Sequence, residues 1–245
     1  MSSLTAKDAI RVWELGHRQR PAERAVTILS AAFPEEDREE LGRLTLGQCN
    51  ARLLAVREDV FGKQLNGFWE CPNCGERLEF TLSSSALNQT GIDEAPGPEF
   101  ELESEGYNLR FRPLEIADLN AMVVAGSQVE TARHRLVERC VVEARFRDER
   151  VAAADLPETV IADLAVRLAE CDAGAEVLLD LVCPTCQNTQ QLPFDIASFF
   201  YKEISWQAQN LMREVGSLAR AYGWGETEIL SMSARRRQFY LEMVE

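Results

Sequence analysis

The chain has 245 residues, enough for one sizeable hydrophobic core or two small ones, and its 46% apolar and 27% charged composition is that of an ordinary globular protein. No apolar run approaches the roughly 18 residues that a membrane-spanning helix needs, and the start of the chain has no apolar segment typical of a signal peptide. The formal net charge of −14 argues against nonspecific binding to nucleic acid, whose phosphates would be repelled.

Helical spacing of apolar residues predicts a helical N-terminal region over residues 1–65. We expect a first helix over residues 5–15 and a second that begins at Pro21 and stops at Pro34. After an acidic stretch, Thr45 is placed to cap a third helix. These helices lead directly into the first of two cysteine motifs.

Two Cys-Pro-X-Cys motifs, Cys71–Cys74 and Cys183–Cys186, dominate the sequence. Each is flanked by alternating polar and apolar residues, which predicts two β-hairpins over residues 66–85 and 176–194 with a motif at each turn. Two such turns supply the four thiolates of a tetrahedral zinc site, here Cys71, Cys74, Cys183 and Cys186. The motifs therefore predict a split zinc ribbon whose Zn²⁺ is structural, because four thiolates leave no position open for water or substrate.

Alternatives to zinc are two disulfides or a redox-active cysteine pair. The odd count of seven cysteines and the hairpin context argue against both, because a thioredoxin-type pair needs a βαβ setting. Cys49, Cys140 and Cys171 lie in helical patterns and are expected to be buried apolar residues. After the first motif Gly75 can adopt positive φ, and after the second we expect Asn188 to be the residue that tolerates it best.

Between the hairpins lies an inserted α/β segment, residues 86–175, entered through a polar linker. Its predicted elements are a hairpin with strands at 100–103 and 108–112, followed by helices over 113–122 and 130–145 and a helix from Pro157 that stops at Gly174.

The C-terminal helical module, residues 195–245, is predicted to have four helices. They are a short one capped by Asp195 and ending at Phe200, a longer one carrying Ile204 to Ala219, a short one over 227–232, and a last one over 234–244. This order suggests a helix-turn-helix, but six basic and six acidic residues after position 201 leave the module neutral, unlike a DNA-binding unit. Arg235–Arg237 are therefore interpreted as a solvated face or a contact with an acidic protein.

No motif for nucleotide binding, zinc-dependent proteolysis or a serine nucleophile is present, and the two histidines lie far apart in polar settings. We therefore predict no catalytic residues and a protein that is not an enzyme. An enzyme with a carboxylate pocket formed only on folding, between the insertion and the N-terminal helices, stays an open hypothesis.

The C-terminal run from Glu214 through Tyr222-Gly223-Trp224-Gly225 to Leu241 resembles a segment of T-even-type phage baseplate hub and assembly proteins and of their counterparts in contractile injection systems. The split cysteine pair also looks like the injection-system members. The resemblance implies a non-enzymatic structural or assembly protein that contacts baseplate or hub proteins and is made in the cytoplasm of the producing bacterium. The protein either stays in the finished particle or leaves after assembly. The C-terminal helices would offer the partner surface, with Trp224, Ile229, Leu230, Arg235, Arg236, Arg237 and Tyr240.

The expected fold is thus α+β, with a split zinc ribbon, an inserted α/β segment and helical units at both ends. The alternative function is a zinc-ribbon adaptor in a transcription or other nucleic-acid complex, which a basic patch on the folded surface would favour.

Overall fold

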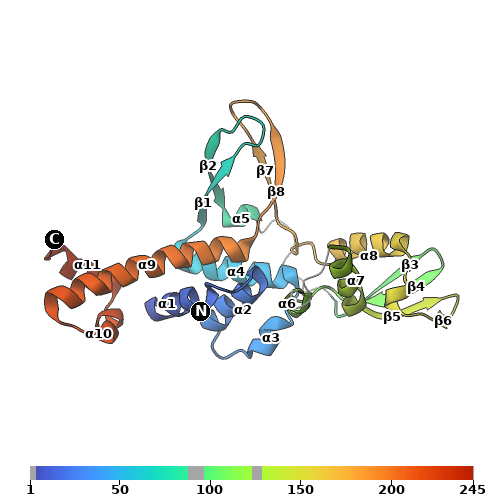
Figure 1. Cartoon of the computed structure of the whole chain (residues 1–245), viewed down its shortest axis with the longest axis horizontal. Helices are drawn as coiled ribbons and strands as arrows, with labels where there is room; N and C mark the ends of the chain where they lie inside the picture. The colour runs from blue at the N-terminus through green and yellow to red at the C-terminus, as the bar shows by residue number, and fades with distance from the viewer. Residues whose placement is uncertain (1–3, 88–96, 123–128, 245) are drawn as a thin grey trace.

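The computed structural model describes residues 4–87, 97–122 and 129–244. It is a mixed α and β protein with small antiparallel sheets, as predicted. Figure 1 shows a central helical body from which three parts extend: two hairpins on one side, a small sheet with two helices at one end, and the C-terminal helices at the other. In the described part of the chain, every helix is too short or too polar to span a lipid bilayer.

The helical body is built around the longest helix. It contains α1 (Ala6–Gly16), α2 (Pro21–Ala32), α3 (Arg38–Gly42), α4 (Leu46–Phe61), α6 (Ile116–Met122) and α9 (Ile196–Tyr222). Thr5 and Thr45 cap α1 and α4 through capping boxes, and Pro21 is the first residue of α2, as predicted. The short α3 lies in the acidic stretch, where Asp37 caps it, and was not predicted.

Helix α9 is continuous, so the predicted break after Phe200 is wrong. The sequence has no proline or glycine at that point, and Phe200, Tyr201 and Ile204 are all buried against the other helices of the body. Packing therefore holds the two predicted segments in one helix. Helix α1 lies close enough to α9 that a Cβ on Gly16 would clash with the ring of Tyr201, whose hydroxyl donates to the carbonyl of Trp13.

The hairpin arm comprises two antiparallel hairpins, each a two-stranded sheet of its own. The strands are β1 (Gln64–Glu70), β2 (Arg77–Ser83), β7 (Leu178–Val182) and β8 (Thr189–Pro193), and α5 (Ser84–Leu87) follows β2. The register pairs Glu70 with Arg77 and Val182 with Thr189, so each cysteine motif occupies a turn. Figure 1 shows the two hairpins side by side, away from the helical body.

The sheet module lies between the hairpins in sequence. It contains β3 (Phe100–Ser104), β4 (Tyr107–Phe111), α7 (Val129–Cys140), β5 (Val141–Phe146), β6 (Glu149–Arg150), the 3₁₀ turn η2 (Ala153–Asp155) and α8 (Glu158–Cys171). The four strands form an antiparallel sheet in the order β3-β4-β5-β6. Leu109, Phe111 and Ala144 on the sheet pack with Val160 and Leu164 of α8.

The predicted helix over 130–145 is wrong beyond Cys140. Residues from Val141 onward form β5, which pairs with β4, and the carbonyl of Cys140 accepts from the backbone N–H of Arg112. The apolar residues at 136, 137, 140 and 141 continue a helical spacing, but the neighbouring strand offers a ladder that suits the β-branched pair Val141 and Val142 better. Tertiary pairing decides the structure here.

The C-terminal module folds back on the end of α9. Gly223, at φ 72°, ends α9, and α10 (Glu226–Ser231) and α11 (Ala234–Glu242) follow, the latter capped by Ser233 as predicted. Val215 and Leu218 of α9 pack with Ile229 of α10 in a small separate core.

Candidate metal centre

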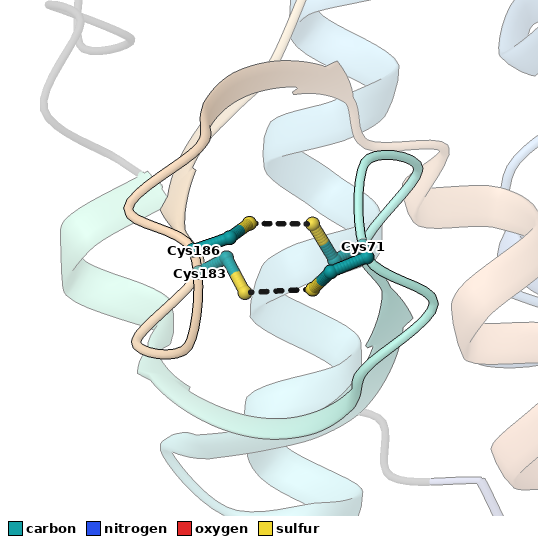
Figure 2. Close-up of side chains that lie close together, drawn as sticks. Cys71, Cys183 and Cys186 are labelled. Carbon is teal, nitrogen blue, oxygen red and sulfur yellow. Dashed lines mark hydrogen bonds between the residues drawn. The ribbon is translucent and has the colours of Figure 1, made fainter.

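The two cysteine motifs meet at the tip of the hairpin arm. The Sγ atoms of Cys71 and Cys186 lie 3.6 Å apart, as do those of Cys74 and Cys183, and all four Sγ atoms lie within 4.8 Å of one another. Figure 2 shows the sulfur atoms of one turn facing those of the other. The structure thus brings together the four cysteines predicted as ligands, from segments more than 100 residues apart.

Both turns have the same backbone hydrogen bonds. In the first, the N–H of Gly75 donates to the carbonyl of Cys71 at 2.8 Å. In the second, the N–H of Gln187 donates to the carbonyl of Cys183, also at 2.8 Å. A tight turn of this kind points both of its cysteine side chains toward one point, and the two turns repeat the arrangement from opposite sides.

Each turn also places one residue in the left-handed region of backbone conformation. Gly75 has φ 73°, and its counterpart is Gln187, with φ 59°. The expectation that Asn188 fills this role is therefore wrong by one residue. The Gln187 side chain compensates in part, because its amide donates to the carbonyl of Pro184 at 3.1 Å.

The surroundings of the sulfurs are asymmetric. Cys71 and Cys183 are buried over Trp69, whereas Cys74 is exposed. A side-chain hydrogen bond from Asn73 of the opposite turn and a backbone one at Asn188 lower the pKa of Cys186 to about 6. Such bonds favour the thiolate, which is the form that binds metals. In the same cluster, a backbone hydrogen bond at Glu76 favours the thiolate of Cys74, but desolvation and hydrogen bonds with the other three thiols outweigh it and raise its pKa to about 12. The shared protons therefore belong to the cluster, and Cys186 is the thiol most readily ionised.

The spacing suits a tetrahedral metal site and not a pair of disulfides. A disulfide requires about 2.05 Å between sulfurs, far less than the 3.6 Å between the two closest pairs. Zinc–thiolate bonds of about 2.3 Å in a tetrahedron place the sulfurs about 3.8 Å apart. The four cysteines could therefore hold one metal ion, and four thiolates are the donor set of structural Zn²⁺ sites.

The other three cysteines lie away from this cluster. Cys49 and Cys140 are buried, as predicted, and burial raises the pKa of both thiols to about 12. Cys171 is only partly buried, on α8.

The residues predicted as a partner surface do not share one exposed face. Ile229 is fully buried, and Arg237 is buried with its guanidinium bonded to Glu214 at 2.9 Å and to the carbonyl of Met232 at 2.7 Å. Their side chains therefore face the protein interior, because α10 and α11 pack against α9.

The remaining predicted contact residues divide into two groups. Trp224 and Tyr240 are half-buried in an aromatic cluster with Tyr222, with ring centroids 4.4 to 5.6 Å apart, and Leu230 is also half-buried. Arg235 and Arg236 are exposed. The prediction of a partner surface in this module thus reduces to the two arginines and the rim of the aromatic cluster.

Sequence reasoning missed a groove at the base of the hairpin arm. It has a volume of about 620 Å³, and its walls carry Phe68, Trp69 and Phe80 from one hairpin, Leu181 and Leu192 from the other, and Phe199 and Trp206 from α9. The helical spacing of Phe199, Lys202 and Trp206 was the available signal. It could not identify the groove, because the opposite walls come from distant segments.

Comparison with known proteins places this arrangement in a family. No curated protein and no solved structure matches the chain. Residues 17–200, a span that contains both cysteine turns and the sheet module, match the model of the family described as T4 bacteriophage base plate protein, and the chain therefore belongs to that family.

Proposed function

We propose that this baseplate-family protein is a non-enzymatic structural or assembly component of the baseplate hub of a contractile phage-tail-like particle. The observation that carries the proposal is the family match over residues 17–200. The proposal takes residues 1–65, 86–175 and 195–245 as units joined by a split zinc ribbon at 66–85 and 176–194. Its partners are other baseplate or hub proteins, with which it assembles in the bacterial cytoplasm, either entering the particle or leaving after assembly.

In this proposal the ion in the cysteine cluster is Zn²⁺ and its role is structural. What supports it is the all-cysteine donor set, the approach of all four sulfurs to within 4.8 Å of one another and the absence of a backbone ladder between the two hairpins in the described residues. Residues Cys71, Cys74, Cys183 and Cys186 would hold the ion. Bound there, it would fix the angle between the two hairpins.

In this proposal the groove beside the hairpins binds a partner and does not carry out chemistry. Among its lining residues only Lys202 and Glu203 are charged, and Glu203 is held by Arg57 in two hydrogen bonds of 2.6 and 2.9 Å. Paired catalytic carboxylates are therefore lacking in this cavity. An apolar groove of this kind suits binding better than acid–base chemistry.

The test is to tag the protein in cells that produce the particle, purify intact particles and measure both protein and metal. We expect the protein in the baseplate fraction, or with baseplate intermediates if it leaves after assembly, and about one zinc per chain by elemental analysis. Cys183→Ser should abolish the zinc, whereas Cys171→Ser is the matched control and should retain it. Recovery with a polymerase or nucleic acid in place of baseplate proteins would overturn the functional proposal, and protein free of zinc would overturn the metal assignment.

A further inference from the structure

The groove at the base of the hairpin arm is bounded by exposed aromatic side chains. Phe68 on β1 is 80% exposed and Trp206 on α9 is 69% exposed, although both line the groove. Figure 1 shows β1 and β2 rising from the helical body beside α9, which is why residues of these distant elements line one groove. Large apolar side chains gathered around a concave apolar surface are typical of a protein-binding site.

The groove side of α9 has a defined pattern. Phe199, Lys202, Glu203 and Trp206 follow the spacing i, i+3, i+4, i+7, so they lie on one face of the helix. Lys202 and Glu203 therefore lie between the aromatic rings of Phe199 and Trp206. Because Glu203 is bound to Arg57, the pair leaves one charge available to a ligand, and it is positive.

The charge of this face is opposite to that of the molecule. Lys202 is exposed and forms no ion pair with any described residue. Further along the same helix, Arg213 is also exposed. Among the described residues, its guanidinium donates a hydrogen bond only to the side-chain carbonyl of Asn210. Between 196 and 213 the sequence has no acidic residue except Glu203. The α9 wall of the groove, which is apolar and carries Lys202, is therefore complementary to an apolar segment that carries a carboxylate. Beside the opposite wall the exposed Glu79, which pairs with Phe68 across the hairpin, would repel that carboxylate and so favours its placement at Lys202.

We propose that this groove binds an apolar segment of another baseplate protein that carries a carboxylate side chain beside its apolar residues. The apolar side chains enter the groove between Phe68 and Trp206, and the carboxylate pairs with Lys202. This inference rests on the proposed baseplate role and adds the docking surface and the chemistry of the docked segment. A second copy of the chain would be the other occupant, and crosslinking detects it directly.

The first test places a photo-reactive phenylalanine analogue at position 68 or 206 in cells that assemble the particle. The analogue keeps an aromatic ring at both sites, and the same analogue at Val166, 59% exposed on α8, is the control. We expect both groove positions to crosslink to one segment of another baseplate protein, and peptide sequencing to find Asp or Glu next to apolar residues. The control position should not crosslink to that segment.

The second test measures binding of the identified partner to the purified protein. Trp206→Ala should weaken binding about thirtyfold or more, as expected for an aromatic residue at the centre of an interface. Lys202→Glu should weaken it about tenfold, and replacing the partner's carboxylate by lysine should restore binding to that variant. Lys7→Glu makes the same change in net charge at an exposed position on α1 and should leave binding unchanged.

Three outcomes would overturn the inference. Crosslinking to a second copy of this chain would make the groove a self-association site. Absence of crosslinks at both groove positions, in particles that contain the protein, would show that the groove is not a docking surface and leave the baseplate role intact. If the Lys202→Glu and Lys7→Glu variants bound the partner equally well, Lys202 would not pair with a carboxylate of the partner. Absence of the protein from particles and intermediates would instead contradict the baseplate role itself.

Discussion

Asp118 is a buried carboxylate at the junction between the helical body and the sheet module. It accepts two hydrogen bonds from Arg112, at 2.8 and 3.0 Å, one from Arg139 at 2.7 Å and one from the backbone N–H of Glu115 at 2.9 Å. Burial alone would raise the pKa of this carboxyl, but these hydrogen bonds outweigh it and hold the pKa below its usual range. The side chain thus ties α6 to the end of β4 and to α7.

Replacing Asp118 by Asn should lower the free energy of unfolding at pH 7 by about 2 kcal/mol. The loss is smaller than for a fully buried pair, because the Arg112 and Arg139 side chains are 24% and 41% exposed. The folded pKa is depressed, so the contribution of the carboxylate is present above the unfolded pKa of about 3.9 and is lost as the pH falls through the folded pKa. Urea unfolding at pH 7 and pH 3 measures the difference between the two proteins.

The control for this prediction is Asp155→Asn, which changes the same group at an exposed position in η2. It should leave the free energy of unfolding within about 0.5 kcal/mol of the parent. If the difference between the parent and Asp118→Asn were the same at pH 7 and at pH 3, the charge of Asp118 would not be its cause.

Two glycines give a paired prediction about backbone conformation. Gly75 has φ 73° and Gly216 lies within α9, and a Cβ at either position would meet nothing within 4 Å. Any effect of an alanine substitution on stability therefore comes from the backbone conformation and not from new contacts. Gly75→Ala should destabilise the protein by about 1 kcal/mol, because an L residue is strained at that φ, whereas Gly216→Ala should stabilise it by up to about 1 kcal/mol. Urea unfolding of both variants measures the two effects, and a change of the same sign in both would contradict the argument.

At the scale of elements, the hairpin arm depends on contacts at its tip and its base. Its two sheets are separate, and an isolated two-stranded hairpin is only marginally stable in water. At the base, Leu65 and Leu179 join the core of the helical body. At the tip, the four cysteines bring the hairpins together above a small apolar cluster that includes Trp69 and Leu78 of the first hairpin and Leu181 and Leu192 of the second.

Removing the proposed Zn²⁺ with a chelator under reducing conditions should therefore loosen the arm first. We expect backbone amides within Gln64–Ser83 and Leu178–Pro193 to exchange with solvent at least about tenfold faster, while amides of α9 around Ile204 keep their protection. Hydrogen exchange followed by mass spectrometry resolves the two regions, and chelator treatment of Cys183→Ser, which lacks a ligand, should add no further change. Equal acceleration in α9 would mean that the ion stabilises the helical body directly.

The accuracy of sequence-based prediction also differs from element to element. The caps at Thr5 and Thr45 and the two cysteine turns were predictable, because each signal lies within a few neighbouring residues. The strand that begins at Val141 was not, since its spacing is helical and only pairing with β4 decides the outcome. The groove was also invisible, because Phe68 and Trp206 become neighbours only when β1 and α9 pack together.

At the scale of the whole molecule, Arg57 joins three parts of the fold. Its side chain is 3% exposed and bonds to both carboxylate oxygens of Glu203 on α9, to the carbonyl of Gly62 after α4 and to that of Gln64 at the start of β1. One guanidinium thus fixes where the first hairpin leaves the helical body. It also holds the carboxylate of Glu203, so that Lys202 is left available to a ligand.

Arg57→Met should therefore lower the free energy of unfolding by about 3 kcal/mol or more, because it leaves Glu203 and two carbonyls without their donor. Arg57→Lys should restore less than half of that loss, since an ammonium cannot span the fork between the carboxylate and both carbonyls. Thermal and urea unfolding compare the variants, with Arg77→Met as the control, because the ion pair of Arg77 with Glu70 is exposed. If Arg57→Lys were as stable as the parent, charge alone would be sufficient at this site. The orientation of the arm would then have to come from the apolar contacts of Leu65 and Leu179 at its base.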